Sequence, residues 1–356
     1  MLKIILPIGL SFHTFQAMSY TIEVYRGNFK AERHFGIYAL YVMFYPQLVA
    51  GPIERPQNVL HQFREKHNFN PVLFQAGLRL MLWGLFKKVV IADRLAIYVD
   101  GVFDSPEQLG SLNYILATVF FSVQIYCDFS GYSDIAIGSA RTMGFDLMTN
   151  FNRPYFSTNI REFWSRWHIS LSTWFRDYLY IPLGGNRVSK SRLYYNTVIV
   201  FMLSGFWHGA KWTFVVWGGL HAIYSVIHMA TKSYFEKMKK RFGWYRLAAV
   251  FTTFALVSFA WIFFRANNLH SAGHVISGWF SGGQGFTRVL GPNEIMIMTF
   301  IAIMVAFMFF VESRTTPSLT ELNTKFNVDL LLSTTVLILI ICFGVFNRNS
   351  FIYFQF

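Results

Sequence analysis

The sequence predicts an all-α integral membrane protein. Hydrophobic residues make up 54% of the 356 residues and aromatic residues 19%, whereas Asp, Glu, Lys and Arg together reach only 14%, compared with about 25% in soluble domains. The apolar residues also gather in stretches long enough to cross, or nearly cross, the ~30 Å hydrocarbon core of a bilayer. Because so few charged side chains could not cover a soluble protein of this size, we expect the chain to lie in a lipid bilayer.

Eight apolar stretches are candidate membrane segments, and the apolar start of the chain would add a ninth. The eight are Phe35–Val49, Val72–Phe86, Leu112–Cys127, Tyr195–Trp207, Trp212–His228, Leu247–Phe264, Ile295–Val311 and Leu330–Phe346. No second soluble domain, internal repeat or long polar linker interrupts them, so residues 1–356 are expected to form a single membrane domain. The start, Met1 to Phe12, has no small-residue cleavage site and is untypical of a signal peptide. We interpret it as the end of a longer hydrophobic region.

Basic residues predict which loops face the cytoplasm. Seven Lys and Arg stand against two acids between residues 153 and 192, and six against one between 232 and 246, so both regions are expected on the cytoplasmic side. The loop Asp100–Gly110 has acids but no Lys or Arg, and Ala266–Asn293 has a single basic residue. We expect both outside, together with Phe351–Phe356. This distribution accounts for the net charge of +13 without a nucleic-acid partner.

Lys87 and Lys88 do not fit this scheme. They stand about 11 residues before the outward loop, or ~17 Å as a helix, which is too short for a membrane span. We therefore expect the segment that carries them to be tilted, broken or interfacial.

The stretch Leu203–Trp212 (LSGFWHGAKW) contains the first candidate site. The apolar helix that enters it, Tyr195 to Trp207, has only about 13 residues, or ~20 Å, so His208 is expected within the membrane thickness, at a break flanked by glycine. Irregular backbone at that depth survives only where protein or a water-filled cavity surrounds it, and an ionisable residue there indicates function. The alternative is a histidine that forms a hydrogen bond to a neighbouring helix.

The amphipathic stretch 161–178 contains the second candidate site. Aromatic and apolar residues recur there at helical spacing, while the remaining positions are charged. The first group is Trp164, Trp167, His168, Leu171, Trp174 and Tyr178, and the second is Arg161, Glu162, Arg166, Arg176 and Asp177. Such a basic, aromatic helix lies in the membrane interface, here on the cytoplasmic side. His168 lies on its aromatic side, and a histidine of the aromatic belt at headgroup level is an equally good interpretation.

Asp128 and Asp134 form a polar cluster with three hydroxyl residues beside an apolar helix (CDFSGYSD). Carboxylates at membrane depth pair with each other, with a base or with a backbone donor. We expect a structural role for this pair, such as anchoring Arg or His side chains. A third acid, Glu54 in the phrase GPIERP, belongs either to a cavity wall or to a plain turn.

Several familiar catalytic motifs are absent. The sequence has no Gly-x-Ser-x-Gly nucleophile elbow, no phosphate-binding Gly-x-x-x-x-Gly-Lys loop and no His-Glu-x-x-His metal helix. The two cysteines, Cys127 and Cys342, both lie in apolar stretches, which excludes a disulfide framework and a cysteine-based zinc site. His208, His221 and His228 have the wrong spacing for one metal, so we expect no bound metal or cofactor.

Five long phrases of the sequence carry a family resemblance. They are Arg161–Gly185 (REFWSRWHISLSTWFRDYLYIPLGG), Leu203–Trp212, Phe351–Phe356 (FIYFQF), Val49–Pro56 (VAGPIERP) and Asp128–Gly144 (DFSGYSDIAIGSARTMG). Together they resemble the membrane-bound O-acyltransferase superfamily, and within it the alginate O-acetyltransferase branch that acts on exopolysaccharides. The resemblance spans almost the whole chain. Members usually carry further hydrophobic helices before the part that corresponds to Leu6–Gly27, so this chain is expected to lack those N-terminal helices.

The resemblance implies a site and a location. The family's catalytic histidine, in the Trp-His-Gly phrase, corresponds to His208, and its second signature residue, a histidine in this branch, corresponds to His168. Members of this fold have a thin protein centre between a cytoplasmic and an outer funnel, joined by a tunnel. The acyl donor enters from inside and the acceptor waits outside. The implied location is the bacterial cytoplasmic (inner) membrane, which the chain crosses several times.

Transfer from a thioester to a hydroxyl needs a base for the alcohol and a hydrogen-bond donor for the developing oxyanion. We expect His208 to act as the base and His168 to orient or polarise the thioester carbonyl. The remaining residues expected to shape the tunnel or its cytoplasmic mouth are Trp164, Trp207, Trp212, Ser204, Arg176 and Asp177. The expected donor is acetyl-CoA or another acyl thioester. The expected acceptor is an exported polysaccharide or a periplasmic partner that resembles an acetyltransferase or esterase.

Two other functions remain open. A relative with the same fold and histidines could transfer D-alanine from a carrier-protein thioester to teichoic acid. From a different class, the chain could be a transporter or flippase whose histidines relay protons, although the sequence shows no inverted repeat to support it.

Overall fold

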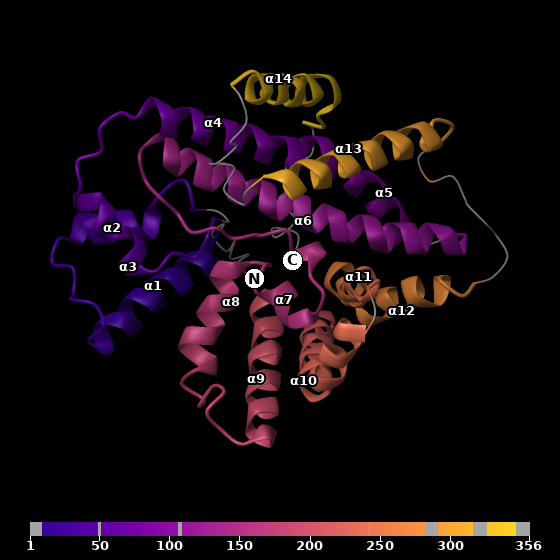
Figure 1. The fold of residues 1–356 in the computed structure, drawn as a ribbon, viewed down its shortest axis with the longest axis horizontal. Coiled ribbons are helices and arrows are strands. Elements are labelled where there is room, and N and C mark those ends of the chain that lie inside the picture. The colour runs from indigo at the N-terminus through magenta and orange to yellow at the C-terminus, as the bar shows by residue number, and fades with distance from the viewer. Residues whose placement is uncertain are drawn as a thin grey trace, which may run out of the picture.

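The computed structural model describes residues 9–48, 51–105, 109–241, 243–281, 289, 291–315 and 326–346. Helices are the only regular elements within these ranges, which confirms the all-α prediction (Figure 1). The closing phrase Phe351–Phe356, the first eight residues, and Val49 and Ala50 of the phrase VAGPIERP lie outside the described residues.

The helices follow one another with short connections. The α-helices are α1 (Leu10–Tyr25), α2 (Phe35–Met43), α3 (Pro56–Val59), α4 (Pro71–Leu85), α5 (Asp93–Phe103), α6 (Ser111–Thr142), α7 (Ile160–Trp164), α8 (Ile169–Phe175), α9 (Lys190–His208), α10 (Trp212–Arg241), α11 (Tyr245–Arg265), α12 (Leu269–Gly278), α13 (Glu294–Arg314) and α14 (Phe326–Phe343). Two short 3₁₀ helices, η1 (Gln62–Arg64) and η3 (Pro154–Phe156), and two π-helical segments, η2 (Phe86–Ala92) and η4 (Arg176–Tyr180), complete the described elements.

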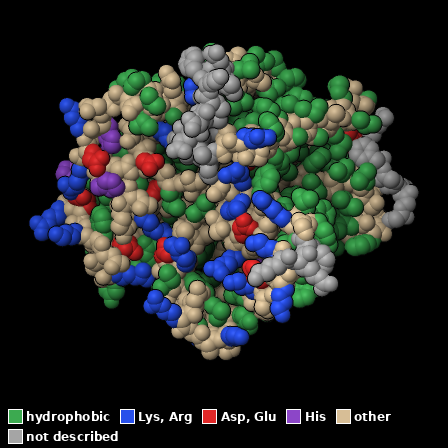
Figure 2. Space-filling view, viewed as in Figure 1, with side chains coloured by type: hydrophobic (Ala, Val, Ile, Leu, Met, Phe, Trp, Pro, Cys, Tyr) green, Lys and Arg blue, Asp and Glu red, His purple; other side chains and the backbone are tan. Residues whose placement is uncertain are grey.

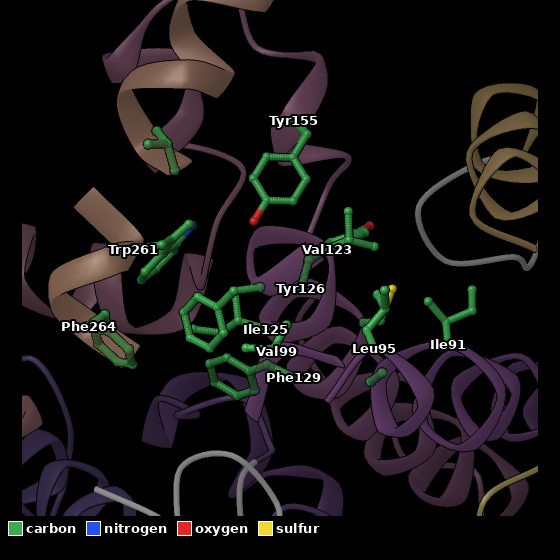
Figure 3. Close-up of a cluster of buried hydrophobic side chains, with 14 of the residues drawn as sticks. Ile91, Leu95, Val99, Val123, Ile125, Tyr126, Phe129, Tyr155, Trp261 and Phe264 are labelled. Carbon is green, nitrogen blue, oxygen red and sulfur yellow. The ribbon is translucent and has the colours of Figure 1, made fainter. Parts of the chain in front are cut away.

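Helix α6 lies at the centre of the fold. It is 32 residues long, is largely buried, and contacts α4, α5, α11 and α12. Figure 1 shows α4 and α6 running alongside each other, with α8 and α9 below them and roughly across their direction. Figure 3 shows how buried side chains cover α6 on two sides. Ile91 and Leu95 lie on one side, and Trp261 and Phe264 of α11 lie on the other.

Glycines allow α4 and α6 to approach closely. Gly77 of α4 faces Gly138 of α6, and Gly84, seven residues later in α4, faces Gly131, seven residues earlier in α6. A Cβ atom added to any of the four would lie between 2.4 and 2.6 Å from the carbonyl oxygen of the opposite glycine. Small residues at matching positions are typical of helix pairs packed inside membranes.

The segment with Lys87 and Lys88 is a broken helix, one of the three possibilities that the sequence left open. The α-helical pattern of α4 ends at Leu85, continues as the π-helical η2, and resumes in α5 at Asp93. Both lysines make ion pairs inside the protein, so they are no indicators of the cytoplasmic side.

Four helices in the described ranges are long and apolar enough to cross a membrane. They are α6, α10 over Trp212–Lys239, α11 and α13, whereas the apolar part of α14, Leu330–Phe343, is shorter. The other predicted segments do not meet that length and composition. For example, α2 has nine residues and α4 has 15. The count of eight or nine membrane segments therefore stays a prediction.

Candidate active site

His168 lies at a sharp break in the chain rather than on a continuous helix. The single helix expected over residues 161–178 is divided into α7, α8 and η4, and His168 is the residue before α8. Its φ of 42° lies in the left-handed region, which is uncommon for a residue other than glycine and is typical of functional sites. The break forms because the chain around Asn150 binds there: Ile169 N–H donates to the Asn150 carbonyl oxygen (2.9 Å), and Asn152 N–H donates to that of Arg166 (2.9 Å).

The Asn150 side chain determines which nitrogen of His168 carries a proton. Asn150 Oδ1 accepts the backbone N–H of Ser170 (3.2 Å) and its hydroxyl (2.9 Å), so the atom facing His168 is an oxygen. His168 Nδ1 lies 3.2 Å from that oxygen and must therefore donate to it. In the neutral ring the lone pair is then on Nε2.

Aromatic rings surround the His168 imidazole. Phe129 contacts it edge-on at 4.6 Å between ring centroids, and Phe12 and Phe151 stack against it at 6.2 and 6.4 Å. The residue is only 1% exposed. Nε2 has no hydrogen-bond partner among the described residues, so its lone pair is available to a molecule that enters this space.

Glu54 holds the loop that carries Asn150. Its side chain is fully buried and accepts the Met148 N–H at 2.5 Å and the Asn58 amide at 3.2 Å. Glu54 is therefore more than a turn residue, because it joins the chain after α2 to the chain two residues before Asn150. Burial raises the pKa of this carboxyl to about 7.

His208 ends α9, at the break that the sequence predicted. The helix is longer than expected, with 19 residues from Lys190, because Ser189 caps its start by accepting the Arg192 N–H. At ~28 Å the helix nearly matches the bilayer core, so the depth of His208 does not follow from a short helix. The glycine after it is required, since a Cβ at Gly209 would lie 2.7 Å from the Phe214 ring.

The fold brings the two candidate histidines together. The His208 ring packs against Trp207, Trp217 and Phe264 at 4.9, 5.1 and 5.0 Å between centroids. Trp207 in turn contacts Phe12, which stacks on His168. The two imidazoles are thus linked through the rings of Trp207 and Phe12. One site therefore combines residues from α1, α8, α9, α10 and α11.

The other predicted tunnel residues divide into two groups. Trp207 lies at the site, Trp164 packs on Trp217 at 5.8 Å, and Ser204 is buried one turn before His208 on α9. Trp212 is 72% exposed at the start of α10, and its place in the tunnel stays a prediction.

Arg176 and Asp177 lie in a separate polar group. They form an ion pair with each other at 2.7 Å, and Asp177 also pairs with Arg55 at 3.5 Å. The Arg55 guanidinium lies over the Tyr178 ring. Within the described chain, these ion pairs connect the segment after α8 to Arg55. The role of Arg176 and Asp177 at the cytoplasmic mouth stays a prediction.

Asp128 and Asp134 anchor lysines rather than Arg or His. Asp134 binds Lys87 at 2.5 Å, and Asp128 binds Lys88. Glu312 of α13 adds a further carboxylate 3.6 Å from Lys87 Nζ and accepts the Tyr126 hydroxyl. This buried cluster connects η2, α6 and α13, in line with the structural role expected from the sequence.

Sequence reasoning missed Phe12, Asn150, Ser170 and Trp217. Asn150 belongs to no recognisable motif, and its role appears only when the loop after α6 meets His168. Sequence reasoning also gave no role to His221, which is fully buried among aromatic rings, including Trp164 and Trp217. Its spacing of four residues from Trp217 was the available signal.

Comparison with known proteins identifies relatives of the whole described fold. The family model described as "MBOAT, membrane-bound O-acyltransferase family" matches residues 32–272. A peptidoglycan O-acetyltransferase of Helicobacter pylori is 41% identical over 307 residues, which cover 78% of this chain and 57% of that protein. A probable alginate O-acetylase AlgI of Pseudomonas putida is 36% identical over 374 residues, covering 99% of this chain and 76% of that protein.

A more distant group is also similar. A teichoic acid D-alanyltransferase of Streptococcus thermophilus is 30% identical over 291 residues, covering 72% of this chain and 68% of that protein. The chain thus spans 57% to 76% of the length of these three curated relatives.

Proposed function

Because this chain belongs to the membrane-bound O-acyltransferase family, we propose that it transfers an acyl group from a thioester donor to a hydroxyl group of an extracytoplasmic glycan. The observation that carries this proposal is that one cluster of aromatic rings joins His168 to His208. Two imidazoles at one place supply both functions that the reaction needs, a base and a donor to the oxyanion.

The hydrogen bond to Asn150 favours a different division of labour from the one expected from the sequence. A neutral His168 that already donates through Nδ1 has no N–H left to polarise a carbonyl. It does have a lone pair on Nε2. We therefore assign to His168 the removal of the hydroxyl proton, and to His208 a hydrogen bond to the oxyanion that forms on the thioester carbon. The hydroxyl oxygen then forms the new ester bond, and the thiol leaves with a proton.

The more similar relatives support acetyl as the transferred group. Two of the three relatives described above are named as O-acetylating enzymes, at 41% and 36% identity, against 30% for the D-alanyltransferase. The proposed donor is acetyl-CoA or another acyl thioester, and the proposed acceptor is a polysaccharide or peptidoglycan, reached directly or through a periplasmic partner. Donor competition in membrane vesicles between acetyl-CoA and a D-alanyl carrier protein distinguishes the two reactions.

The proposed location is the bacterial cytoplasmic membrane, with the donor entering from the cytoplasm. A transporter built on the same histidines would move its substrate without modifying it. Detection of ester-linked acetyl groups on the glycan therefore separates this alternative from transfer.

Glutamine substitutions test the assignment of roles, because an amide donates a hydrogen bond but cannot take a proton at neutral pH. His168→Ala and His168→Gln should both lower transfer by ~10²–10⁴-fold. His208→Ala should also lose activity, whereas His208→Gln should retain more activity than His208→Ala. The measurement is acetylation of the glycan at matched protein levels, with the exposed His61→Gln as control.

Two results would change this conclusion. Full activity in both alanine variants would show that these histidines are not the active site. An active His168→Gln together with a His208→Gln as inactive as His208→Ala would return the role of base to His208.

A further inference from the structure

A large polar cavity lies between α7, the end of α10 and the start of α11. Its volume is about 720 Å³, and its charged lining consists of Arg161, Glu162, Lys232, Glu236, Lys239 and Arg246. We call it the basic cavity. It is separate from the histidine site, and no residue assigned above to the transfer reaction lines it.

The charges of the basic cavity are unbalanced. Four Lys and Arg side chains stand against two glutamates, and Glu162 is already paired with Arg166 at 2.6 Å. Within the described chain, Arg161, Lys232, Lys239 and Arg246 form no ion pair of their own. In Figure 2, Lys and Arg side chains gather over α7 and the neighbouring helix ends on this face.

The positive charges lie near one another. Arg161, Lys232 and Arg246 line this one cavity together with His228. Four basic side chains beside only two glutamates leave an excess of positive charge, which an anion would offset. The cavity therefore has the character of a site for a ligand with more than one negative charge.

The neutral polar groups of the lining are already used within the protein. The Thr158 hydroxyl donates to the Glu162 carboxylate (2.7 Å), Asn159 Oδ1 accepts the Glu162 N–H (2.9 Å), and the Ser165 hydroxyl donates to the Glu162 carbonyl oxygen (2.7 Å). The groups that remain for a ligand are therefore the basic side chains. Arginine donors arranged in a fork match the oxygen atoms of phosphate.

The cavity also has a defined relation to the histidine site. Arg161 and Trp164 share the short helix α7, and the Trp164 ring contacts Trp217, whose ring contacts His208. By the distribution of basic residues in the sequence, both α7 and the end of α10 are expected on the cytoplasmic side.

We propose that the basic cavity binds the phosphate groups of a phosphorylated ligand through Arg161, Lys232 and Arg246. Two sources share this chemistry, a soluble nucleotide and the headgroup of an anionic phospholipid. The site does not depend on the proposed transfer reaction, because binding is measured without acyl transfer.

The test compares two variants that lose equal charge. The cavity variant is R161Q/K232Q/R246Q. The control variant is R187Q/K190Q/R192Q, whose three exposed residues lie at the start of α9 and outside the cavity. The purified full chain in phosphatidylcholine nanodiscs is titrated with ADP, and the binding curve is read from tryptophan fluorescence. Separately, native mass spectrometry counts phosphatidylglycerol molecules retained in detergent.

The expected result is a loss specific to the cavity variant. Its affinity for ADP should fall by more than ~10-fold, or its retention of phosphatidylglycerol should disappear, while the control variant behaves like wild type. A loss of ADP binding identifies the ligand as a soluble nucleotide, and a loss of phosphatidylglycerol retention identifies it as a lipid headgroup. The proposal is overturned if wild type binds neither probe, if the cavity variant binds both as wild type does, or if both variants lose binding equally.

Discussion

His221 differs from the other buried site histidine, His168, in its hydrogen bonds. Neither ring nitrogen has a hydrogen-bond partner among the described residues, and the residue is fully buried. His168, by contrast, uses one nitrogen in a hydrogen bond to Asn150. An unsatisfied buried polar atom costs about 1–3 kcal/mol, so His221 is a site where a polar group destabilises the fold.

His221→Phe should therefore leave the free energy of unfolding unchanged or raise it by about 1 kcal/mol, because phenylalanine fills the same aromatic surroundings without the two nitrogens. Thermal unfolding of the purified protein measures this. His168→Phe is the matched control and should destabilise, because it removes the hydrogen bond between His168 Nδ1 and Asn150 Oδ1. A clear loss of stability in His221→Phe would contradict this prediction. It would mean that the ring nitrogens form hydrogen bonds to groups outside the described chain.

Glu54 makes stability depend on pH. Its folded-state pKa of about 7 lies above the ordinary value of 4.5, with burial as the main cause. A group whose pKa is raised on folding contributes stability that is complete below the unfolded-state pKa and is lost as the pH rises through the folded-state pKa. The stability of the wild type should therefore fall by up to ~1.4 kcal/mol per pH unit between about pH 4.5 and 7.

Glu54→Gln should remove that dependence, because the amide does not titrate. Unfolding midpoints of both proteins at pH 5, 6, 7 and 8 provide the measurement, and the exposed Glu65→Gln is the control. Parallel curves for wild type and Glu54→Gln would contradict the prediction.

At the scale of helices, the four glycines between α4 and α6 set the distance between the two axes. Gly84→Ala or Gly131→Ala places a Cβ within 2.6 Å of a backbone oxygen, so the helices must separate. We expect a loss of about 1–3 kcal/mol in thermal unfolding. Gly273→Ala in α12 is the control, because its Cβ would meet nothing within 4 Å and alanine favours the helix by up to ~1 kcal/mol. Equal effects at the two places would contradict this account.

The elements also show what the sequence could predict. Apolar stretches located α6, α10, α11 and α13, because a membrane helix needs about 20 apolar residues in a row. The break at His168 was not predictable, since 161–178 has helical spacing throughout and the residue that interrupts it, Asn150, arrives from a distant loop. For the same reason, the sequence identified the two histidines as site residues but did not identify the residues that contact them.

For the whole molecule, the basic residues predict that the end of α10 faces the cytoplasm and that α12 lies outside. Ser233→Cys and His270→Cys, each exposed and each placed in a Cys342→Ser background, test this with a membrane-impermeant maleimide. Position 270 should react in intact cells, and position 233 only after the membrane is opened. Reaction of both positions under the same condition would show that α11 does not cross the membrane.

The paired lysines have a consequence for how the chain enters the bilayer. Lys88 has a partner close by in Asp93, but Lys87 leaves the ribosome before Asp134 and Glu312, the carboxylates that neutralise it. A lysine at the centre of a membrane helix costs ~2.5–3.5 kcal/mol when it has no partner. The segment formed by α4 and η2 is thus a poor candidate for insertion by itself. It has to wait in the translocation machinery or at the lipid surface until α6 emerges, so that the two helices are inserted together as one unit.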